Sequence, residues 1–190
     1  LLFDMDGVLA DVSGSYREAT LRTAASFGVE ITIRDIEVAT AGGNANDCWV
    51  LTRRLMSERG VDRPLAEMKM RFEEIYQGTE AEPGLRRTER LLLDRAELLA
   101  LGQRRPLAVV TGRPRADADR FLTERGIADC FQTAVTMEDA PIKPDPAPVR
   151  LALERLGVAT AWMVGDTPDD LRAARGAGVL PIGGVAPGDD

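Results

Sequence analysis

The chain opens with LLFDMDGVLAD, residues 1–11, in which two aspartates directly follow a short apolar run. An apolar run that ends in acids is typical of a strand buried in a parallel sheet, with the acids at its carboxyl end. Asp4 and Asp6 are one residue apart, so in an extended chain their side chains lie on the same face. Because buried carboxylates without partners cost several kcal/mol, this stretch predicts a functional site.

Four further apolar segments predict strands in the remainder of the chain. Segments with helical periodicity separate the last four expected strands. This alternation of strand and helix predicts an α/β fold with a Rossmann-like parallel sheet. The expected strands span residues 1–6, 106–112, 131–136, 161–166 and 179–184.

The segment between the first two expected strands is too long for a single crossover helix and has helical periodicity throughout. It therefore predicts a helical cap domain inserted after the first strand. Its last part, GLRRTERLLLDRAELLALG at 84–102, predicts the helix that returns the chain to the sheet. The expected domains are a core of residues 1–13 and 84–190 and a cap of residues 14–83.

Composition and charge exclude several classes of partner. Hydrophobic residues make up 44% and charged residues 29% of the 190-residue chain, which is typical of a soluble globular protein. The net charge of −7 argues against a nucleic-acid partner, since phosphate backbones bind to basic surfaces. No apolar run approaches the roughly 18 residues of a membrane span. We therefore expect no nucleic acid and no membrane as partners.

The chain contains no histidine, which excludes a Ser-His-Asp triad, a Cys-His dyad and an HExxH zinc site. Any catalysis must use carboxylates, lysine, arginine, threonine or a metal. Cys48 and Cys130 lie far apart in unlike contexts, which favours reduced thiols over a disulfide. Reduced thiols indicate a reducing compartment, so we expect a cytoplasmic protein.

The carboxyl ends of the expected strands bring several polar side chains to one edge of the sheet, where open α/β sheets bind their ligands. Three or more carboxylates in one cleft repel each other, and a hard divalent cation such as Mg²⁺ removes the conflict. A lysine and a hydroxyl nearby suit the oxygens of a phosphoryl group. The residues expected at this edge are Asp4, Asp6, Thr111, Gly112, Arg113, Lys143, Asp166 and Asp170.

Within this set, the two acids of the first strand suggest a division of labour. Asp4, at the strand tip, could attack phosphorus and carry the group as an acyl phosphate. Asp6 could protonate the leaving alcohol and then activate a water molecule. Asp170 also has a structural interpretation, because Thr167, Pro168 and Asp170 fit a helix N-terminus with a capping box.

Four stretches together resemble the motifs of the haloacid dehalogenase superfamily, in the right order and with a long gap after the first. The helical insertion resembles the cap of phosphoglycolate-phosphatase-like members of subfamily I. Because halide release needs no proton donor, the dehalogenase branch has no acid at the position of Asp6, so Asp6 indicates phosphoryl transfer. The four stretches are DMDGVLAD (4–11), VVTG (109–112), IKPDP with Lys143 (142–146) and VGDTPDDLRAARGAG (164–178).

The resemblance implies a role for each matching residue. Asp4 is the nucleophile and binds Mg²⁺, while Asp6 is the general acid/base and binds the metal through its backbone carbonyl. Thr111 contacts the phosphoryl oxygens and Lys143 neutralises the nucleophile and the transferring group. Asp166 ligates the metal directly, and Asp170 acts on the metal through water or orients Lys143. Further expected substrate contacts are Gly112, Arg113, Arg17 and Asn44, the last two from the cap.

These residues predict a Mg²⁺-dependent phosphatase that hydrolyses a small phosphorylated metabolite through an aspartyl-phosphate on Asp4, as a monomer or homodimer. Two alternatives stay open at this point. A phosphomutase of the same superfamily, similar to β-phosphoglucomutase, shares the chemistry and differs in the fate of the phosphoaspartate. A non-catalytic binding module could retain the fold, although the intact set of charged residues weighs against it.

Overall fold

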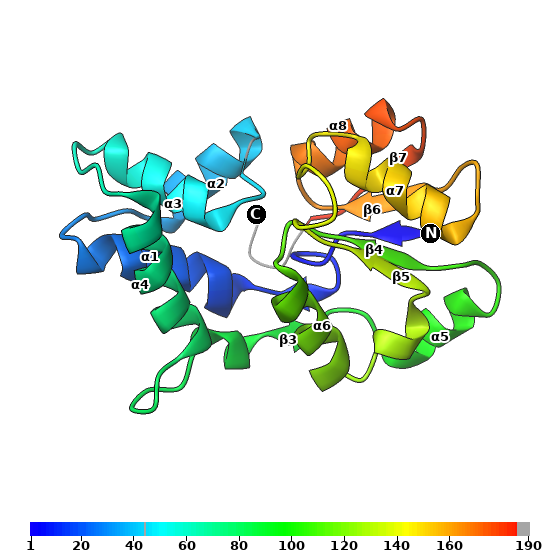
Figure 1. The fold of residues 1–190 in the computed structure, drawn as a ribbon, viewed down its shortest axis with the longest axis horizontal. Helices are drawn as coiled ribbons and strands as arrows, with labels where there is room; N and C mark the ends of the chain where they lie inside the picture. Colours follow the sequence, from blue (N-terminus) through cyan, green and yellow to red (C-terminus); the bar gives the residue numbers. More distant parts are fainter. Residues whose placement is uncertain (44, 186–190) are drawn as a thin grey trace. The chain divides into compact units, whose positions relative to one another are not determined.

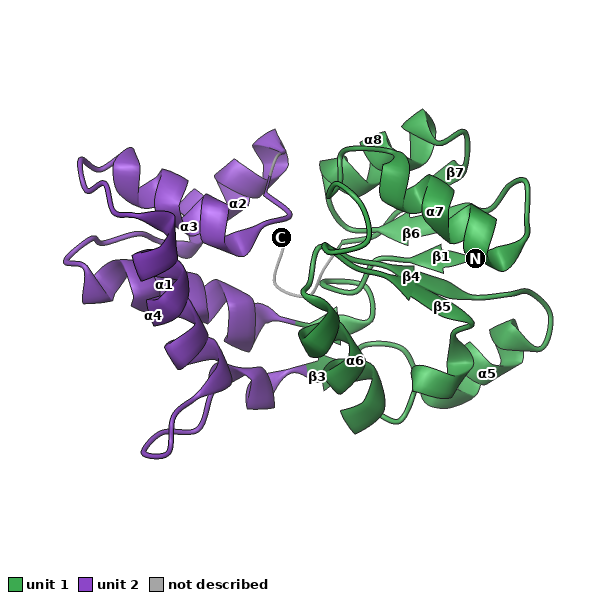
Figure 2. Cartoon of the chain, viewed as in Figure 1, with its two compact units in different colours: residues 1–11, 90–190 green, residues 12–89 purple. Residues whose placement is uncertain are grey.

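The computed structural model describes residues 1–43 and 45–185, and they form two compact units. One unit contains Leu1–Asp11 and the chain from Arg90 onward, and the other contains Val12–Glu89 (Figure 2). The boundaries predicted from the sequence, 13/14 and 83/84, lie somewhat inside the observed insertion.

The first unit is built on a five-stranded parallel sheet in the order β5-β4-β1-β6-β7 (Figure 1). The predicted α/β fold with a Rossmann-like sheet is confirmed, and strand β1, which carries the first acids at its end, is the central strand. The register pairs Leu2 with Ala108 on one side and with Met163 on the other. The strands are β1 (Leu2–Phe3), β4 (Ala108–Val110), β5 (Thr133–Val135), β6 (Trp162–Gly165) and β7 (Leu180–Gly183).

Helices cover both faces of this sheet, because side chains that alternate along each strand are apolar on both sides. Leu2 packs in a buried cluster with residues of α7 and α8, whereas the next residue, Phe3, makes an edge-to-face contact with Phe131. In Figure 1, α7 and α8 lie on one side of the sheet, and α5 and α6 on the other. The helices are α5 (Arg95–Gly102), α6 (Arg115–Glu124), α7 (Ala147–Leu156) and α8 (Pro168–Gly176).

The single helix predicted over residues 84–102 is wrong. The chain instead forms a short 3₁₀ turn, η2 (Leu85–Thr88), then a two-residue strand, β3 (Arg90–Leu91), and enters α5 only at Arg95. Strand β3 pairs antiparallel with β2 (Ala10–Asp11). A capping box between Asp94 and Glu97 starts α5 and explains why the helix cannot begin earlier.

The second unit is a bundle of four helices that are preceded by a short π-helical turn, η1 (Ser13–Arg17). The buried side chains of α4 include Met68, Phe72 and Tyr76, and the Tyr76 ring stacks on Tyr16 with centroids 4.4 Å apart. Buried Glu89 accepts hydrogen bonds from the Tyr76 hydroxyl and from Ser15. The helices are α1 (Glu18–Ser26), α2 (Ile33–Gly42), α3 (Cys48–Ser57) and α4 (Leu65–Gln77).

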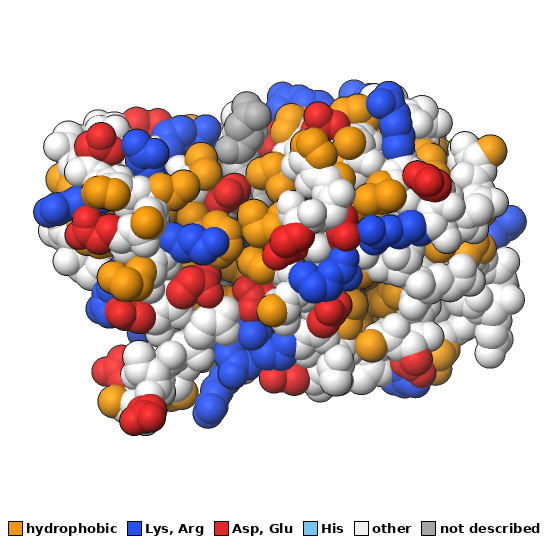
Figure 3. All heavy atoms as spheres, in the orientation of Figure 1, with side chains coloured by type: hydrophobic (Ala, Val, Ile, Leu, Met, Phe, Trp, Pro, Cys, Tyr) orange, Lys and Arg blue, Asp and Glu red, His pale blue; other side chains and the backbone are white. Residues whose placement is uncertain are grey.

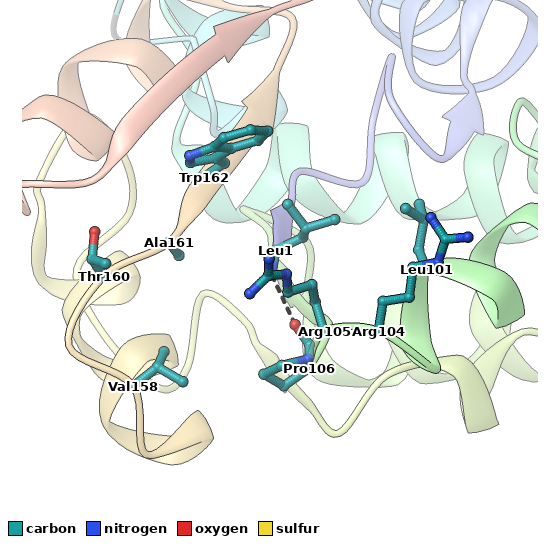
Figure 4. Close-up of a pocket in the computed structure, with 9 residues that line it drawn as sticks. All are labelled: Leu1, Leu101, Arg104, Arg105, Pro106, Val158, Thr160, Ala161 and Trp162. Atoms are coloured by element: carbon teal, nitrogen blue, oxygen red, sulfur yellow. Dashed lines mark hydrogen bonds between the residues drawn. The ribbon is translucent and has the colours of Figure 1, made fainter.

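An apolar pocket of about 540 Å³ lies at the amino ends of β1, β4 and β6 (Figure 4). Leu1, Pro106 and Trp162 contribute to its lining, and the Leu1 amino group donates to the Pro106 carbonyl over 2.7 Å. The Trp162 side chain contributes to this lining although the residue is 55% exposed. This pocket is therefore at the edge of the sheet opposite the acids that end β1.

Basic and acidic side chains are interspersed on the face of the molecule that Figure 3 shows. Both cysteines, Cys48 and Cys130, are free thiols. Among the described residues, no helix combines the length and the apolar composition that crossing a bilayer requires.

Candidate active site

Asp4 follows β1 and lies in the middle of the sheet. Its backbone N–H donates to Val164 of β6 over 2.9 Å, so the residue extends the parallel pairing beyond the two residues of β1. The residue is only 4% exposed. The chain thus buries a carboxylate between the two neighbouring strands, and that placement requires charged or polar partners.

Lys143 is the principal partner of Asp4. It comes from the loop between β5 and α7, is 2% exposed, and places Nζ 2.5 Å from Asp4 Oδ1. The same Nζ lies 2.5 Å from Asp170 Oδ1 and donates to the Val110 carbonyl over 3.0 Å. Lys143 thus donates hydrogen bonds to Asp4 and Val110 and forms an ion pair with Asp170. Lys143 is therefore an internal cation held by three neighbours, not a surface lysine.

Asp170 makes both a helix-capping contact and a contact with Lys143. Its Oδ2 accepts hydrogen bonds from the Thr167 backbone N–H and hydroxyl and completes the capping box of α8. Its Oδ1 contacts Lys143. Gly165 makes this position possible, because a Cβ on Gly165 would lie 2.2 Å from the Asp170 Cβ. One carboxylate thus starts a helix and orients the buried lysine.

Asp166 follows β6 and completes a cluster of acids that suits a metal ion. Carboxylate oxygens of Asp4, Asp166 and Asp170 all lie within 4.8 Å of one another. Asp166 Oδ1 is buried and accepts no hydrogen bond from the part of the chain that the structure describes. A buried acceptor with no partner is costly, and a hard cation such as Mg²⁺ takes carboxylate oxygens of this kind. The residues present therefore fit a divalent metal site.

The electrostatics of the cluster also indicate that a cation is needed. Burial raises the pKa of Asp4 well above its usual range, opposed by Lys143 and reinforced by the charges of Asp170, Asp166 and Asp6. Burial and the charges of Asp170 and Asp6 raise the pKa of Asp166 to about 7. Burial alone would lower the pKa of Lys143, but Asp170 and Asp4 outweigh it and raise that pKa. One ammonium group thus leaves an excess of negative charge.

The residues that follow β4 meet the first acidic stretch at the same edge of the sheet. Thr111 is buried, and its hydroxyl accepts a hydrogen bond from the Arg113 backbone N–H over 3.1 Å. Gly112 lies between them, in a bend of the chain. The Arg113 guanidinium contacts the Asp6 carboxylate, with Nε 2.7 Å and Nη2 2.6 Å from Oδ1. The structure therefore pairs Arg113 with Asp6, which the sequence predicts as the general acid/base.

The loop that carries Lys143 is fixed by a separate carboxylate, Asp139. Asp139 Oδ2 accepts from the Thr136 backbone over 2.8 Å and from Arg115, while Oδ1 accepts from Arg155 over 2.9 Å. Partial burial would raise the pKa of Asp139, but hydrogen bonds from Arg155 and Thr136 lower it to about 2. This network anchors the segment between β5 and Lys143 on the core.

The structure describes one of the two cap residues that the sequence predicts as substrate contacts. Arg17 is the last residue of η1 in the helical unit and is half-buried there. Asn44 lies outside the described residues. Their roles as substrate contacts remain predictions from the sequence.

Two contributors to the site carry a weaker signal in the sequence. Gly165 is the glycine of the VGD triplet. Asp170 packs directly against it, and this contact leaves no room for a Cβ at position 165. Asp139 lies in a loop of mixed sequence, and its partners Arg115 and Arg155 are far apart along the chain. The TxxD spacing of Thr136 and Asp139 is the local pattern that could have identified it.

This chain is similar to known proteins in both sequence and fold. The family model of haloacid dehalogenase-like hydrolases matches residues 1–183. A phosphoglycolate phosphatase of Yersinia pseudotuberculosis is 32% identical over 187 residues, covering 95% of this chain and 78% of that protein. The solved structure of phosphatase Tt82 from Thermococcus thioreducens matches with a TM-score of 0.73 at 25% identity, over 99% of this chain and 92% of that one.

A further relative has a different length and a different name. An imidazoleglycerol-phosphate dehydratase of Phytophthora nicotianae is 46% identical over 195 residues, which cover 98% of this chain and 43% of that protein. The chain thus spans less than half of that relative, and it covers 78–81% of the length of three phosphoglycolate phosphatases. The match to the family model over nearly the whole length assigns this chain to the haloacid dehalogenase-like hydrolases.

Proposed function

We propose that this hydrolase is a Mg²⁺-dependent phosphatase that acts on a small phosphate monoester, with Asp4 as the nucleophile. One observation carries the proposal: a buried carboxylate, Asp4, is held 2.5 Å from a buried ammonium at the carboxyl edge of the sheet. The neighbouring Asp166 oxygen without a hydrogen-bond partner supports a metal at the same place. The phosphatases among the relatives support the reaction class.

In the first step, a carboxylate oxygen of Asp4 attacks phosphorus, and the bond between phosphorus and the leaving oxygen breaks. Asp6 donates its proton to that leaving oxygen, so the product departs as a neutral alcohol. Lys143 holds the nucleophile in place and offsets charge on the transferring group. The Thr111 hydroxyl is positioned at the same edge to contact the phosphoryl oxygens.

In the second step, a water molecule attacks the phosphoryl group on Asp4 and releases inorganic phosphate. Asp6, now a carboxylate, takes the proton from this water and regains the form in which it began. Asp4, Asp166 and the backbone carbonyl of Asp6 would hold the metal, and Asp170 would keep Lys143 aligned. When bound, Mg²⁺ supplies positive charge for the phosphoryl oxygens.

The test measures phosphate release by the purified protein from a panel of small esters, among them phosphoglycolate, with Mg²⁺ or with EDTA. We expect release that requires Mg²⁺ and that falls by about 10⁴-fold or more in Asp4→Asn, as loss of a nucleophile does elsewhere. Asp129→Asn makes the same chemical change at a surface ion pair with Arg95 and is the matched control. Release that survives in Asp4→Asn would show that the nucleophile is assigned wrongly.

The phosphomutase alternative gives a different result in the same assay. A mutase returns the phosphoryl group to a sugar phosphate and needs a bisphosphate for steady turnover. Isomerisation of a sugar phosphate that depends on added bisphosphate, with little free phosphate, would favour it. Mg²⁺ binding without turnover on any ester would instead favour the non-catalytic binding module.

A further inference from the structure

The contact between Arg113 and Asp6 joins a buried cation to the acid that follows the nucleophile. The Arg113 side chain is 1% exposed, whereas the Asp6 side chain is 37% exposed. Arg113 Nε and Nη2 lie 2.7 and 2.6 Å from the same oxygen, Asp6 Oδ1. Nε thus makes a charge-assisted hydrogen bond to Oδ1, and Nη2 adds an ionic contact to the same oxygen.

Arg113 is itself held in place by the surrounding structure. Its backbone N–H donates to the Thr111 hydroxyl, and its carbonyl accepts from the Met137 N–H over 3.2 Å. Its guanidinium carbon lies 5.2 Å from the centroid of the Phe121 ring. Because the backbone and the end of the side chain are both fixed, Arg113 can impose an orientation on a more exposed partner.

We propose that Arg113 is a positioning residue that aims the Asp6 carboxyl group, so that Oδ2 carries the proton in catalysis. Asp6 Oδ1 accepts the Nε hydrogen bond and lies beside the positive charge of Nη2, and a nearby cation disfavours a proton on that oxygen. The proton is then on the other oxygen, and the rigid guanidinium sets the direction in which Oδ2 points. This proposal rests on the proposed function, since Asp6 needs a proton to transfer.

The proton balance closes through that one oxygen. Asp6 Oδ2–H gives its proton to the leaving oxygen as the ester bond breaks, which leaves Asp6 ionised. The same Oδ2 takes a proton from the attacking water as the bond between phosphorus and Asp4 breaks. Arg113 stays protonated throughout and forms no bond to the substrate.

The sequence predicts that Arg113 contacts the substrate. That role and the positioning role have different kinetic consequences. An arginine that binds substrate would raise KM when it is removed, with a smaller effect on kcat. An arginine that aims the proton donor would lower kcat, and more so for esters whose leaving group needs a proton.

The test is a double-mutant cycle of Arg113→Met and Asp6→Asn on phosphoglycolate, an alkyl ester, and on nitrophenyl phosphate, whose leaving group needs little protonation. We expect Arg113→Met to lower kcat on the alkyl ester by about 10–100-fold, the usual cost of a misplaced catalytic group. It should cost less on nitrophenyl phosphate. In the Asp6→Asn background it should change kcat by less than about twofold, because the partner is already gone.

Two further variants separate positioning from folding. Arg125→Met removes another guanidinium whose carbon lies 5.9 Å from the same Phe121 ring, and it should leave kcat unchanged on both esters. Thermal unfolding shows whether Arg113→Met folds. Arg113→Lys keeps the buried positive charge, and it should recover part of the kcat that Arg113→Met loses.

The possible outcomes are distinct. An effect of Arg113→Met that is equally large with and without Asp6 overturns the positioning role. A rise in KM at unchanged kcat also overturns it and restores the substrate contact. A wild-type protein that hydrolyses no ester overturns the proposed function, and the role of Arg113 in it falls as well.

Discussion

The carboxyl ends and the amino ends of the strands in the five-stranded sheet bury opposite kinds of side chain. At the carboxyl ends of the strands, Asp4, Lys143 and Asp170 are almost completely buried, and Lys143 contacts both acids. At the amino edge, Leu1 and Trp162 help to line an apolar pocket of about 540 Å³ (Figure 4). The same short strands supply both edges.

The comparison shows that buried charged groups are found at the carboxyl ends of the strands, where burial requires them to have partners. Buried ion pairs contribute little net stability, because desolvation offsets their attraction, yet removing one partner is strongly destabilising. An apolar pocket open to solvent has no such interdependence. Substitutions at the carboxyl edge should therefore affect stability and activity together, and substitutions at the amino edge should affect neither strongly.

Lys143→Met gives the largest expected effect and tests the carboxyl edge most directly. Without the ammonium, Asp4 and Asp170 are buried without their shared cation, so we expect a loss of about 3–5 kcal/mol in the free energy of unfolding. Phosphate release should fall by at least about 10²-fold. Urea unfolding and the release assay measure the two effects, and a stable, inactive variant would show that the pair contributes to catalysis alone.

Gly165→Ala tests the close packing of Asp170 against Gly165. The new Cβ would lie 2.2 Å from the Asp170 Cβ, so we expect a loss of about 1–3 kcal/mol in stability. Activity should also fall, because Asp170 would be displaced from Lys143. The control is Gly183→Ala at the register partner on β7, where the Cβ would meet Leu171 at 3.7 Å. Equal effects of the two variants would contradict the prediction.

Asp139→Asn separates a structural charge near the carboxyl edge from the catalytic ones. The pKa of Asp139 is lowered from 3.8 to about 2, so its stabilising effect is complete above pH 3.8 and is lost as the pH falls through 2. We expect the variant to lose about 1 kcal/mol at neutral pH. Urea unfolding at several pH values should show the difference from wild type shrinking in acid. A difference that grows in acid would reverse the sign and refute it.

Trp162→Ala gives the smallest expected effect and tests the amino edge. The residue is 55% exposed and begins β6, at the end of the strand away from Asp166, so stability should change by about 0.5 kcal/mol or less. Phosphate release should be unchanged. A loss of activity in the folded variant would mean that the two edges are coupled.

Local sequence predicts the sheet and its acids well, for a physical reason. An apolar run that ends in Asp4, or in the Gly165-Asp166 pair, shows burial and function within a few residues. Strands β2 and β3 are only two residues long and, unlike the equally short β1, pair in a separate antiparallel ribbon between distant segments, so no local pattern predicts them. The capping box of Asp94 and Glu97 was the local sign that α5 begins late.

Contacts between distant residues account for the remainder. Arg113 and Asp6 are 107 positions apart, and no spacing within either motif indicates that they meet. Lys143 similarly reaches Asp4 and Asp170 only because β1, β5 and β6 are aligned in one sheet. The residue types at the site could be predicted, whereas their pairings depend on the tertiary structure.

The small ribbon of β2 and β3 has a consequence for how such chains can diverge. The chain leaves the core beside Asp11 and returns at Arg90, and these two residues are paired across the ribbon. The intervening segment is therefore a closed loop whose ends are already joined. Doubling the length of such a loop adds only about 0.6 kcal/mol in closure entropy. Evolution could lengthen, shorten or exchange the inserted helices while the register of the central strands stayed unchanged.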